Sequence, residues 1–204
     1  LFRSANVELD AELKGKSLAG RVFGVLPFFE LKGYKYQNAE ADVVIDNQLI
    51  DGFLAIADPN CDVEVEGHLK RAGRDSQVDL NLAVANINLA ALNLYANNAD
   101  KDLSFDANVS LHGDKIDNIN GDVLIKELAF VNESNEGLKL DALHLNAQND
   151  TIPQSITLSS DFVNGSIQGS YDFVSLVPTM QNKLSQALPS LIKPSTKEIV
   201  KERV

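Results

Sequence analysis

The side chains able to do chemistry in this sequence are scattered singly along the chain. Each of the three histidines, His68, His112 and His144, occupies a different stretch, and none has a second histidine at metal-ligand spacing. The sequence contains no Gly-x-Ser-x-Gly motif and no glycine-rich phosphate loop before a helix. We therefore predict a non-enzymatic protein with no catalytic residue, no metal site and no cofactor.

Carboxylates recur two residues apart, as in Asp10 with Glu12 and Glu64 with Glu66. Paired carboxylates are the machinery of glycosidases, but a sugar cleft also needs aromatic platforms. Aromatic residues make up only 6% of the chain and tryptophan is absent. We interpret these acids as solvated residues on the outward faces of strands.

The single cysteine, Cys61, excludes an internal disulfide and a cysteine-based zinc cluster. It alternates with Asp62 and Glu64, and a residue in that position is expected to face inward. We predict that Cys61 is buried and behaves as a small hydrophobe rather than as a reactive thiol.

The composition is that of a globular, acidic chain. Its 204 residues include 29 acids against 18 bases, a net charge of −11, which argues against a fold-wide basic surface for nucleic acid. Hydrophobic residues make up 44% of the chain, so the chain as a whole is not disordered. No run of 18 apolar residues occurs, and we expect no segment of this sequence to span a bilayer.

The elements that position these side chains are marked by apolar residues at every second place. Such alternation is typical of strands with one apolar and one wet face. It runs through Cys61–Leu69, Val78–Val84 and Leu103–Leu111, and weaker examples occur at Val7–Leu13 and Ile156–Ile167. Turn-forming residues separate the runs, mostly every ten to fifteen residues, which favours an antiparallel meander of about eleven or twelve strands.

The fold class we predict is all-β: a curled antiparallel sheet with one apolar face. That face must be hidden by closure into a sandwich or barrel, or stay curled and open. Alternation alone favours a closed β-sandwich core. The apolar positions are mostly Val, Leu, Ile and Ala, and small aliphatic linings leave room that aromatic residues would fill.

Two stretches break the alternation. Residues 88–93 predict one short helical turn capped by Asn88. Apolar residues spaced by three and four predict an amphipathic helix over 173–192, and the remaining 193–204 are expected to form a charged linker. The β segment accordingly covers 1–172.

Three strings of the sequence resemble the TamB family (translocation and assembly module subunit), within the AsmA-like group of Gram-negative envelope proteins, and are most similar to its Bacteroidetes members. The strings are "LPFFELKGYKYQNAEADVVIDNQLIDGFLAIADPNCDVEVEGHL" (Leu26 to Leu69), "INGDVLIKELAF" (Ile119 to Phe130) and "LKLDALHLNAQNDTIPQSITLSSDFVNGSIQGSYDF" (Leu138 to Phe173). The "LSQALPSL" stretch (Leu184 to Leu191) resembles the family's helix end. The resemblance covers most of the chain, and its most specific part is L-x-S-D-F followed by G-x-I-x-G-x-Y-D-F.

The resemblance implies an open, β-taco-like apolar groove rather than a closed core. It implies a periplasmic location, within an inner-membrane-anchored protein that bridges to the outer membrane. Because the family's N-terminal anchor is not evident in this sequence, we expect an internal segment. The implied partners are phospholipid acyl chains, neighbouring β units of the same longer chain, and an outer-membrane barrel protein.

We predict a conduit that cradles lipid acyl chains for phospholipid transport to the outer membrane. The alternative is a scaffold for outer-membrane protein assembly or secretion, in which a free sheet edge pairs with a strand of a barrel protein by β-augmentation. A purely structural envelope spacer is a third class. The residues predicted to line the groove share the apolar side of their strands; they are Val78, Leu80, Leu82, Val84, Leu103, Phe105, Val109, Leu111, Val123, Ile125, Leu140, Leu145, Ile156, Leu158 and Ile167.

Overall fold

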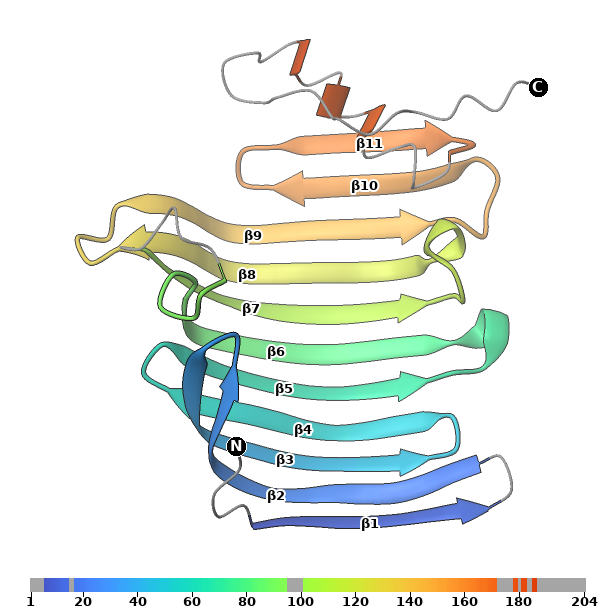
Figure 1. The fold of residues 1–204 in the computed structure, drawn as a ribbon. Coiled ribbons are helices and arrows are strands. Elements are labelled where there is room, and N and C mark those ends of the chain that lie inside the picture. Colours follow the sequence, from blue (N-terminus) through green and yellow to red (C-terminus); the bar gives the residue numbers. More distant parts are fainter. Residues whose placement is uncertain are drawn as a thin grey trace.

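Eleven strands follow one another along the chain and pair in that same order, so that each strand hydrogen-bonds to its sequence neighbours (Figure 1). The computed structural model describes residues 6–14, 17–94 and 101–171, together with Pro178, Thr179, Gln181, Asn182, Ser185 and Gln186. Side chains are described from Ala19 onward, except those of Arg74 and Ile116. Among the described strands, β1 pairs only with β2 and β11 only with β10, so the sheet is not closed.

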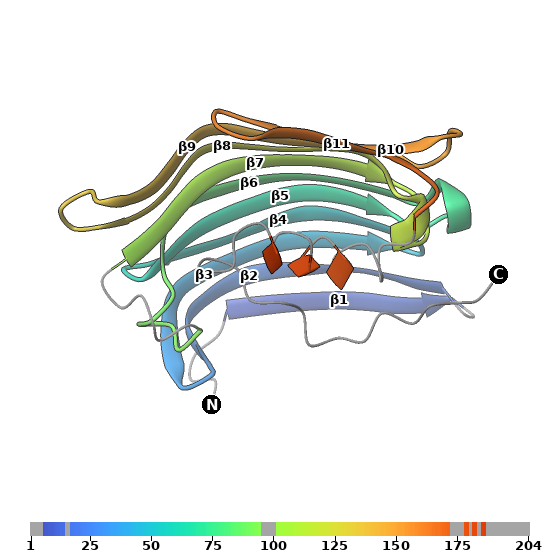
Figure 2. The ribbon, with the colours of Figure 1, turned by 90° about the horizontal axis from the view of Figure 1, so that it is seen from above.

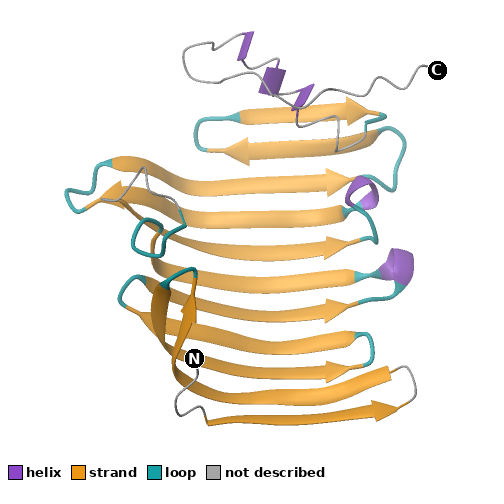
Figure 3. Cartoon of the chain, in the orientation of Figure 1, coloured by secondary structure: helices purple, strands orange, loops and turns teal. Residues whose placement is uncertain are grey.

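All pairings between neighbouring strands are antiparallel. The strands are β1 (Asn6–Lys14), β2 (Ser17–Leu31), β3 (Tyr34–Asp46), β4 (Leu49–Asp58), β5 (Cys61–Lys70), β6 (Gln77–Asn88), β7 (Lys101–His112), β8 (Asn120–Asn132), β9 (Gly137–Gln148), β10 (Gln154–Ser160) and β11 (Asn164–Gly169). Short 3-10 helices η1 (Gly73–Asp75) and η3 (Ile116–Asn118) lie in two of the connections (Figure 3). The all-β antiparallel prediction is confirmed, and the architecture is one open sheet rather than two packed sheets.

The predicted turn over 88–93 lies in the connection after β6. The Ala91 N–H donates to Asn88 Oδ1 at 2.8 Å, and the Leu92 N–H donates to the Asn88 carbonyl at 3.1 Å. Asn88 therefore caps the turn as its position predicts. Of the predicted helix over 173–192, the described residues are few and helical, and the rest, with the linker 193–204, lies outside the described residues.

A line of strand irregularities crosses the sheet near one end of the strands. Pairing skips Pro27 and Asn38 between β2 and β3, and the register shifts again in β5–β6, β6–β7 and β7–β8. Two residues on this line, Asn38 and Glu127, have φ of 49° and 52°, the left-handed region that re-aims a strand. We call this line the crease; Figure 2 shows that the arched strands bend at this end.

Beyond the crease, the β2–β3 hairpin and the 88–93 turn pack together on the inner side of the arch (Figure 2). Asn93 Nδ2 donates to the Lys32 carbonyl at 3.1 Å, which joins the two segments. Their apolar side chains make a small hydrophobic core with residues of β4, β5 and β6. We call this core the filled end; its members are Phe29, Tyr34, Tyr36, Ile56, Cys61, Val63, Ile87 and Leu92.

Candidate functional site: the inner face of the sheet

The register carries apolar residues across the sheet in continuous rows. In an antiparallel pair, directly opposed residues project from the same face, so each row can be followed from strand to strand. The central row reads Val43, Gly52, Gly67, Leu80, Val109, Val123, Leu145, Leu158 and Gly165. This apolar surface, shared with the filled end, is the inner face.

Rows on either side of the central one are also almost wholly apolar. One contains Ala41, Leu54, Val65, Leu82, Ala107, Ile125 and Leu143. The other contains Ile45, Ile50, Leu69, Val78, Leu111, Gly121, Ala147, Ile156 and Ile167. With strands about 4.8 Å apart, the described sheet spans on the order of 50 Å across its strands.

The predicted lining residues all lie on the inner face. Most belong to the three rows, and Val84 pairs with Phe105. Leu103 opposes Ile87 of the filled end, across the irregularity in β6 and β7.

Leu140 lies on the inner face although the alternating pattern of β9 does not predict it. It lies five residues from Leu145, which in a regular strand would put the two on opposite faces. Leu140 pairs with Leu128, and Leu128 follows the left-handed Glu127 on the crease. The irregularity at the crease reverses which residues of the strand face inward. Leu140 therefore lies on the inner face, where it is 7% exposed.

Most inner-face side chains are only partly covered away from the filled end, although the row residues Ala107 and Ala147 are buried. Of the predicted lining residues, Val84 and Leu140 are buried and the others keep intermediate exposure. In the N-terminal half the face is more open, with Ile50 at 41%, Leu54 at 44% and Leu69 at 36% exposed. All eleven described strands belong to one sheet, so none of these strands forms a second layer over this face.

Some inner-face residues were missed when the sequence was read alone. Ile50, Leu54 and Leu69 were not among the predicted lining residues, although they continue the same rows toward β4 and β5. The alternation in Cys61–Leu69 was the signal that could have found the β5 members. For β4 the signal is weaker because Gly52 and Phe53 interrupt it.

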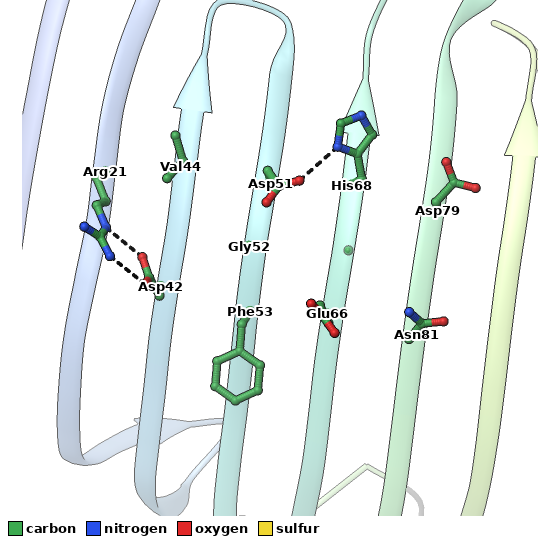
Figure 4. A pocket seen from close by; sticks show the side chains of 11 residues that line it. Arg21, Asp42, Val44, Asp51, Gly52, Phe53, Glu66, His68, Asp79 and Asn81 are labelled. Carbon is green, nitrogen blue, oxygen red and sulfur yellow. Dashed lines mark hydrogen bonds and ion pairs between the residues drawn. The ribbon is translucent and has the colours of Figure 1, made fainter.

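The outer face carries paired polar side chains (Figure 4). Arg21 donates two hydrogen bonds to Asp42, at 2.7 and 2.6 Å, and His68 Nδ1 lies 2.9 Å from Asp51 Oδ2. The Arg21 guanidinium lowers the pKa of the Asp42 carboxyl below its usual value. These pairs are satisfied and exposed, as expected of a solvated face.

Metal-ligating side chains are dispersed over the part of the chain that the structure describes. No group of three or more His, Cys, Asp or Glu in this part of the chain could hold a metal ion. Cys61 is 6% exposed, as predicted, and burial raises the pKa of its thiol. Among the helical residues that are described, none belongs to a helix long and apolar enough to cross a membrane.

Comparison with known proteins gives no relative: no family model, no curated protein and no solved structure matches this chain.

Proposed function

We propose that the inner face binds the acyl chains of phospholipids, and that the protein is a non-enzymatic segment of a TamB-like bridge between the two membranes of a Gram-negative envelope. The observation that carries this proposal is the set of cross-strand apolar rows whose side chains remain partly exposed. Uncovered apolar surface of this extent favours an apolar occupant, because each square ångström removed from water contributes about 25 cal/mol.

The dimensions of the sheet are compatible with such an occupant. An acyl chain reaches about half of a ~30 Å hydrocarbon core, or roughly 15 Å. The central row crosses the strands from β3 to β11, roughly 38 Å at about 4.8 Å per spacing, and has room for more than one chain along its length. The row glycines Gly52 and Gly67 carry no side chain, and side-chain atoms of their row neighbours Val43 and Leu80 lie close to where one would project.

Photo-crosslinking at Val109 tests the proposal. Val109 lies in the central row, and its neighbour Asn108 projects from the outer face, where its side chain bonds to Asn81 Oδ1 at 2.7 Å. A photoreactive amino acid at position 109 should capture phospholipid when the chain is produced in a Gram-negative cell, and one at position 108 should not. Equal capture at both positions, or none at either, would contradict the proposal.

The variant Val109→Asp extends the test. Because Val109 keeps intermediate exposure, a carboxylate there can hydrate when no lipid is bound, and the chain should still fold. An acyl chain placed against that carboxylate would desolvate it at high cost. We expect normal thermal unfolding together with loss of the lipids that co-purify with the wild type, detected by mass spectrometry.

A second candidate function is supported by the edges of the sheet. Within the described residues, β1 and β11 each have one hydrogen-bonded neighbour, so each presents unpaired backbone groups that another strand can use. Neighbouring β units of the same longer chain or a strand of an outer-membrane barrel protein are the proposed partners. A β11 edge position that crosslinks to barrel precursors, with no lipid captured at Val109, would favour assembly over transport.

A further inference from the structure

The strand β9 extends beyond its neighbour β10 at one end. It runs over Gly137–Gln148, but β10 pairs only with the part from Leu143 to Gln148. The first part of β9, residues 137–142, therefore has β8 on one side and no described strand on the other. Figure 1 shows this step, where the ends of β8 and β9 project past the β10–β11 turn. We call the space beside residues 137–142 of β9 the notch.

The backbone groups of β9 that point into the notch follow from its ladder with β8. The Asn132 N–H donates to the Glu136 carbonyl at 3.1 Å, so these two residues form a hydrogen-bonded pair. Leu138 and Leu140 lie two and four residues further along the same register. Because hydrogen-bonded pairs alternate in an antiparallel ladder, Leu138 and Leu140 bond to β8. The residue between them, Lys139, directs its N–H and C=O into the notch.

The Asp141 N–H supports this assignment, because it too points away from β8. It donates to Oδ2 of Asp161, in the β10–β11 turn, at 2.5 Å. A side-chain carboxylate thus takes the place of the carbonyl that a neighbouring strand would offer. The turn is itself fixed, since the Ser160 N–H donates to the Val163 carbonyl at 2.9 Å and the Val163 N–H donates to Ser160 Oγ at 3.1 Å. Asp161 therefore ends the ladder, and Lys139 is the next residue with no strand beside it.

An apolar row of the inner face also stops at the notch. The register links four residues across the strands, from the filled end outward: Ile87, Leu103, Phe130 and Leu138. Leu138 is 47% exposed, and no described strand of the sheet follows it. At the other end of the notch, Phe162 of the β10–β11 turn is 64% exposed. Unpaired backbone groups and uncovered apolar side chains therefore occur together, and one added strand would cover both.

We propose that the notch binds an extended segment of a partner protein, which adds to β9 as a short antiparallel strand. The segment spans about five residues, or roughly 16 Å, because the β10–β11 turn blocks further extension. Its central residue exchanges two backbone hydrogen bonds with Lys139. The residues on either side lie opposite Leu138 and Leu140 in close, non-hydrogen-bonded pairs, and they are aliphatic because they extend the inner face. This site is separate from the edges at β1 and β11, and the inference does not depend on acyl binding.

The charges and side chains at the edges of the sheet favour a partner over a second copy of this chain. Asp141 and Asp161 are exposed beside the notch, and β1 carries Glu8, Asp10 and Glu12 at alternate positions. The β1 edge of another copy would therefore bring like charges together. In β11, two of the three inner-face positions are glycines, so this edge lacks the aliphatic side chains that the notch requires. The partner segment should instead carry a basic residue near Asp141 and Asp161.

The test titrates the peptide acetyl-Lys-Val-Thr-Val-Thr-amide into the 204-residue chain and follows binding by NMR. Binding should slow hydrogen exchange at the Lys139 N–H. Lys139→Pro removes that N–H and no bond to β8, so it should weaken binding about tenfold. Lys139→Thr keeps the N–H and should bind as the wild type does. Urea denaturation of both variants verifies that they fold equally well.

Two control peptides test the same contacts without changing the protein. Methylation of the central amide nitrogen should abolish binding, and glutamate in place of the lysine should weaken it about threefold. If the wild type binds no peptide, or if the methylated peptide and Lys139→Pro both retain full affinity, the inference is wrong. If the chain forms dimers in analytical ultracentrifugation and Lys139→Pro dissociates them, the notch joins two copies and the partner assignment is wrong.

Discussion

The filled end and the rest of the inner face are made from the same alternating strands but bury their side chains to different degrees. At the filled end, a folded-over hairpin and the 88–93 turn supply a second layer, and Leu92 is only 1% exposed. Toward the opposite end the described strands form a single layer, and Leu54 is 44% exposed. Alternation of apolar residues along the strands therefore does not create a core by itself. A core forms where another segment of the chain covers the apolar face.

Satisfied polar groups hold that covering segment in place. Asp58 is 3% exposed, and its carboxylate accepts hydrogen bonds from Tyr34 Oη at 2.5 Å, from the Gln37 N–H at 3.0 Å and from the Asn60 N–H at 2.9 Å. Buried carboxylates are tolerated when their oxygens are bonded in this way. The inner face away from the filled end has no comparable polar anchor among its described row residues, which are nearly all aliphatic. One end of the face is therefore fixed by buried apolar and polar contacts, whereas the remainder keeps partly exposed aliphatic side chains.

The largest expected difference between the two regions is in the free energy of unfolding lost when one leucine in each is replaced by alanine. Leu92→Ala removes a fully buried side chain from the filled end and should cost about 3 kcal/mol of unfolding free energy. Leu54→Ala, on the open face, should cost less than about 1 kcal/mol. Urea denaturation of both variants measures the difference, and equal losses would mean that the open face is packed like a core.

A second comparison uses two inner-face glycines in different surroundings. Gly121 has a φ of 125°, and a Cβ there would overlap the Ser110 carbonyl oxygen, whereas a Cβ at Gly165 would have nothing within 4 Å. Gly121→Ala should destabilise the chain by about 2 kcal/mol, and Gly165→Ala should change its stability by less than about 0.5 kcal/mol. Thermal melts of the two variants provide the measurement; a tolerated Gly121→Ala would show that β7 and β8 are less tightly apposed than described.

The anchor of the filled end can be tested through the pH dependence of stability. The hydrogen bond to Asp58 is the main cause that raises the pKa of Tyr34 above its ordinary value of 10.0. A raised folded-state pKa means that the contribution to stability is complete below pH 10.0 and is lost as the pH rises through the folded-state pKa. Tyr34→Phe should therefore cost about 1 kcal/mol at neutral pH, and the difference from wild type should shrink in alkaline solution.

Denaturation at neutral and alkaline pH, with wild type and Tyr34→Phe side by side, checks this prediction. Tyr171→Phe measures how far such an alkaline effect is shared by another tyrosine, because the Tyr171 hydroxyl bonds to Asn149, outside the filled end, and burial raises its pKa too. A Tyr34→Phe deficit that persists unchanged in alkaline solution would contradict the predicted link to ionisation of the hydroxyl, and no deficit at neutral pH would show that the ring, and not its hydroxyl, stabilises the hairpin.

The smallest expected effect belongs to the outer face. Hydrogen bonds from Asn146 and His144 lower the pKa of the Asp122 carboxyl, so their contribution is present above its unfolded-state pKa and is lost as the pH falls through the folded value. The carboxylate is exposed, and solvent screening keeps such contributions small. Asp122→Asn should change the unfolding free energy by less than about 0.5 kcal/mol, measured from pH 7 downward by urea denaturation; a larger loss would assign the outer face a structural role.

The strands and their faces were predictable from the sequence because alternation is a local property. Spacing alone predicts that one face of the sheet is shared by Val78, Leu80, Leu82 and Val84. Whether a second layer covers that face depends on contacts between distant segments. Leu92 sits in a six-residue turn whose sequence predicts a cap at Asn88, and nothing in it indicates contact with Tyr36, more than fifty residues earlier.

The position of the crease could not be predicted from the sequence either. Glu127 and Asn38 adopt left-handed conformations that asparagine tolerates and glutamate seldom does, so residue type offers a hint at Asn38 and none at Glu127.

The order of the strands has a consequence for how such a molecule can change in length. Because every strand pairs with its sequence neighbours, the ordered structure is close to one-dimensional, and its stability approximates a sum over adjacent pairs. Insertion or deletion of one hairpin alters two interfaces and leaves the others intact. Mutation can therefore tune the reach of the sheet in steps of about 10 Å, two strand spacings, while the chemistry of each surviving row is inherited unchanged.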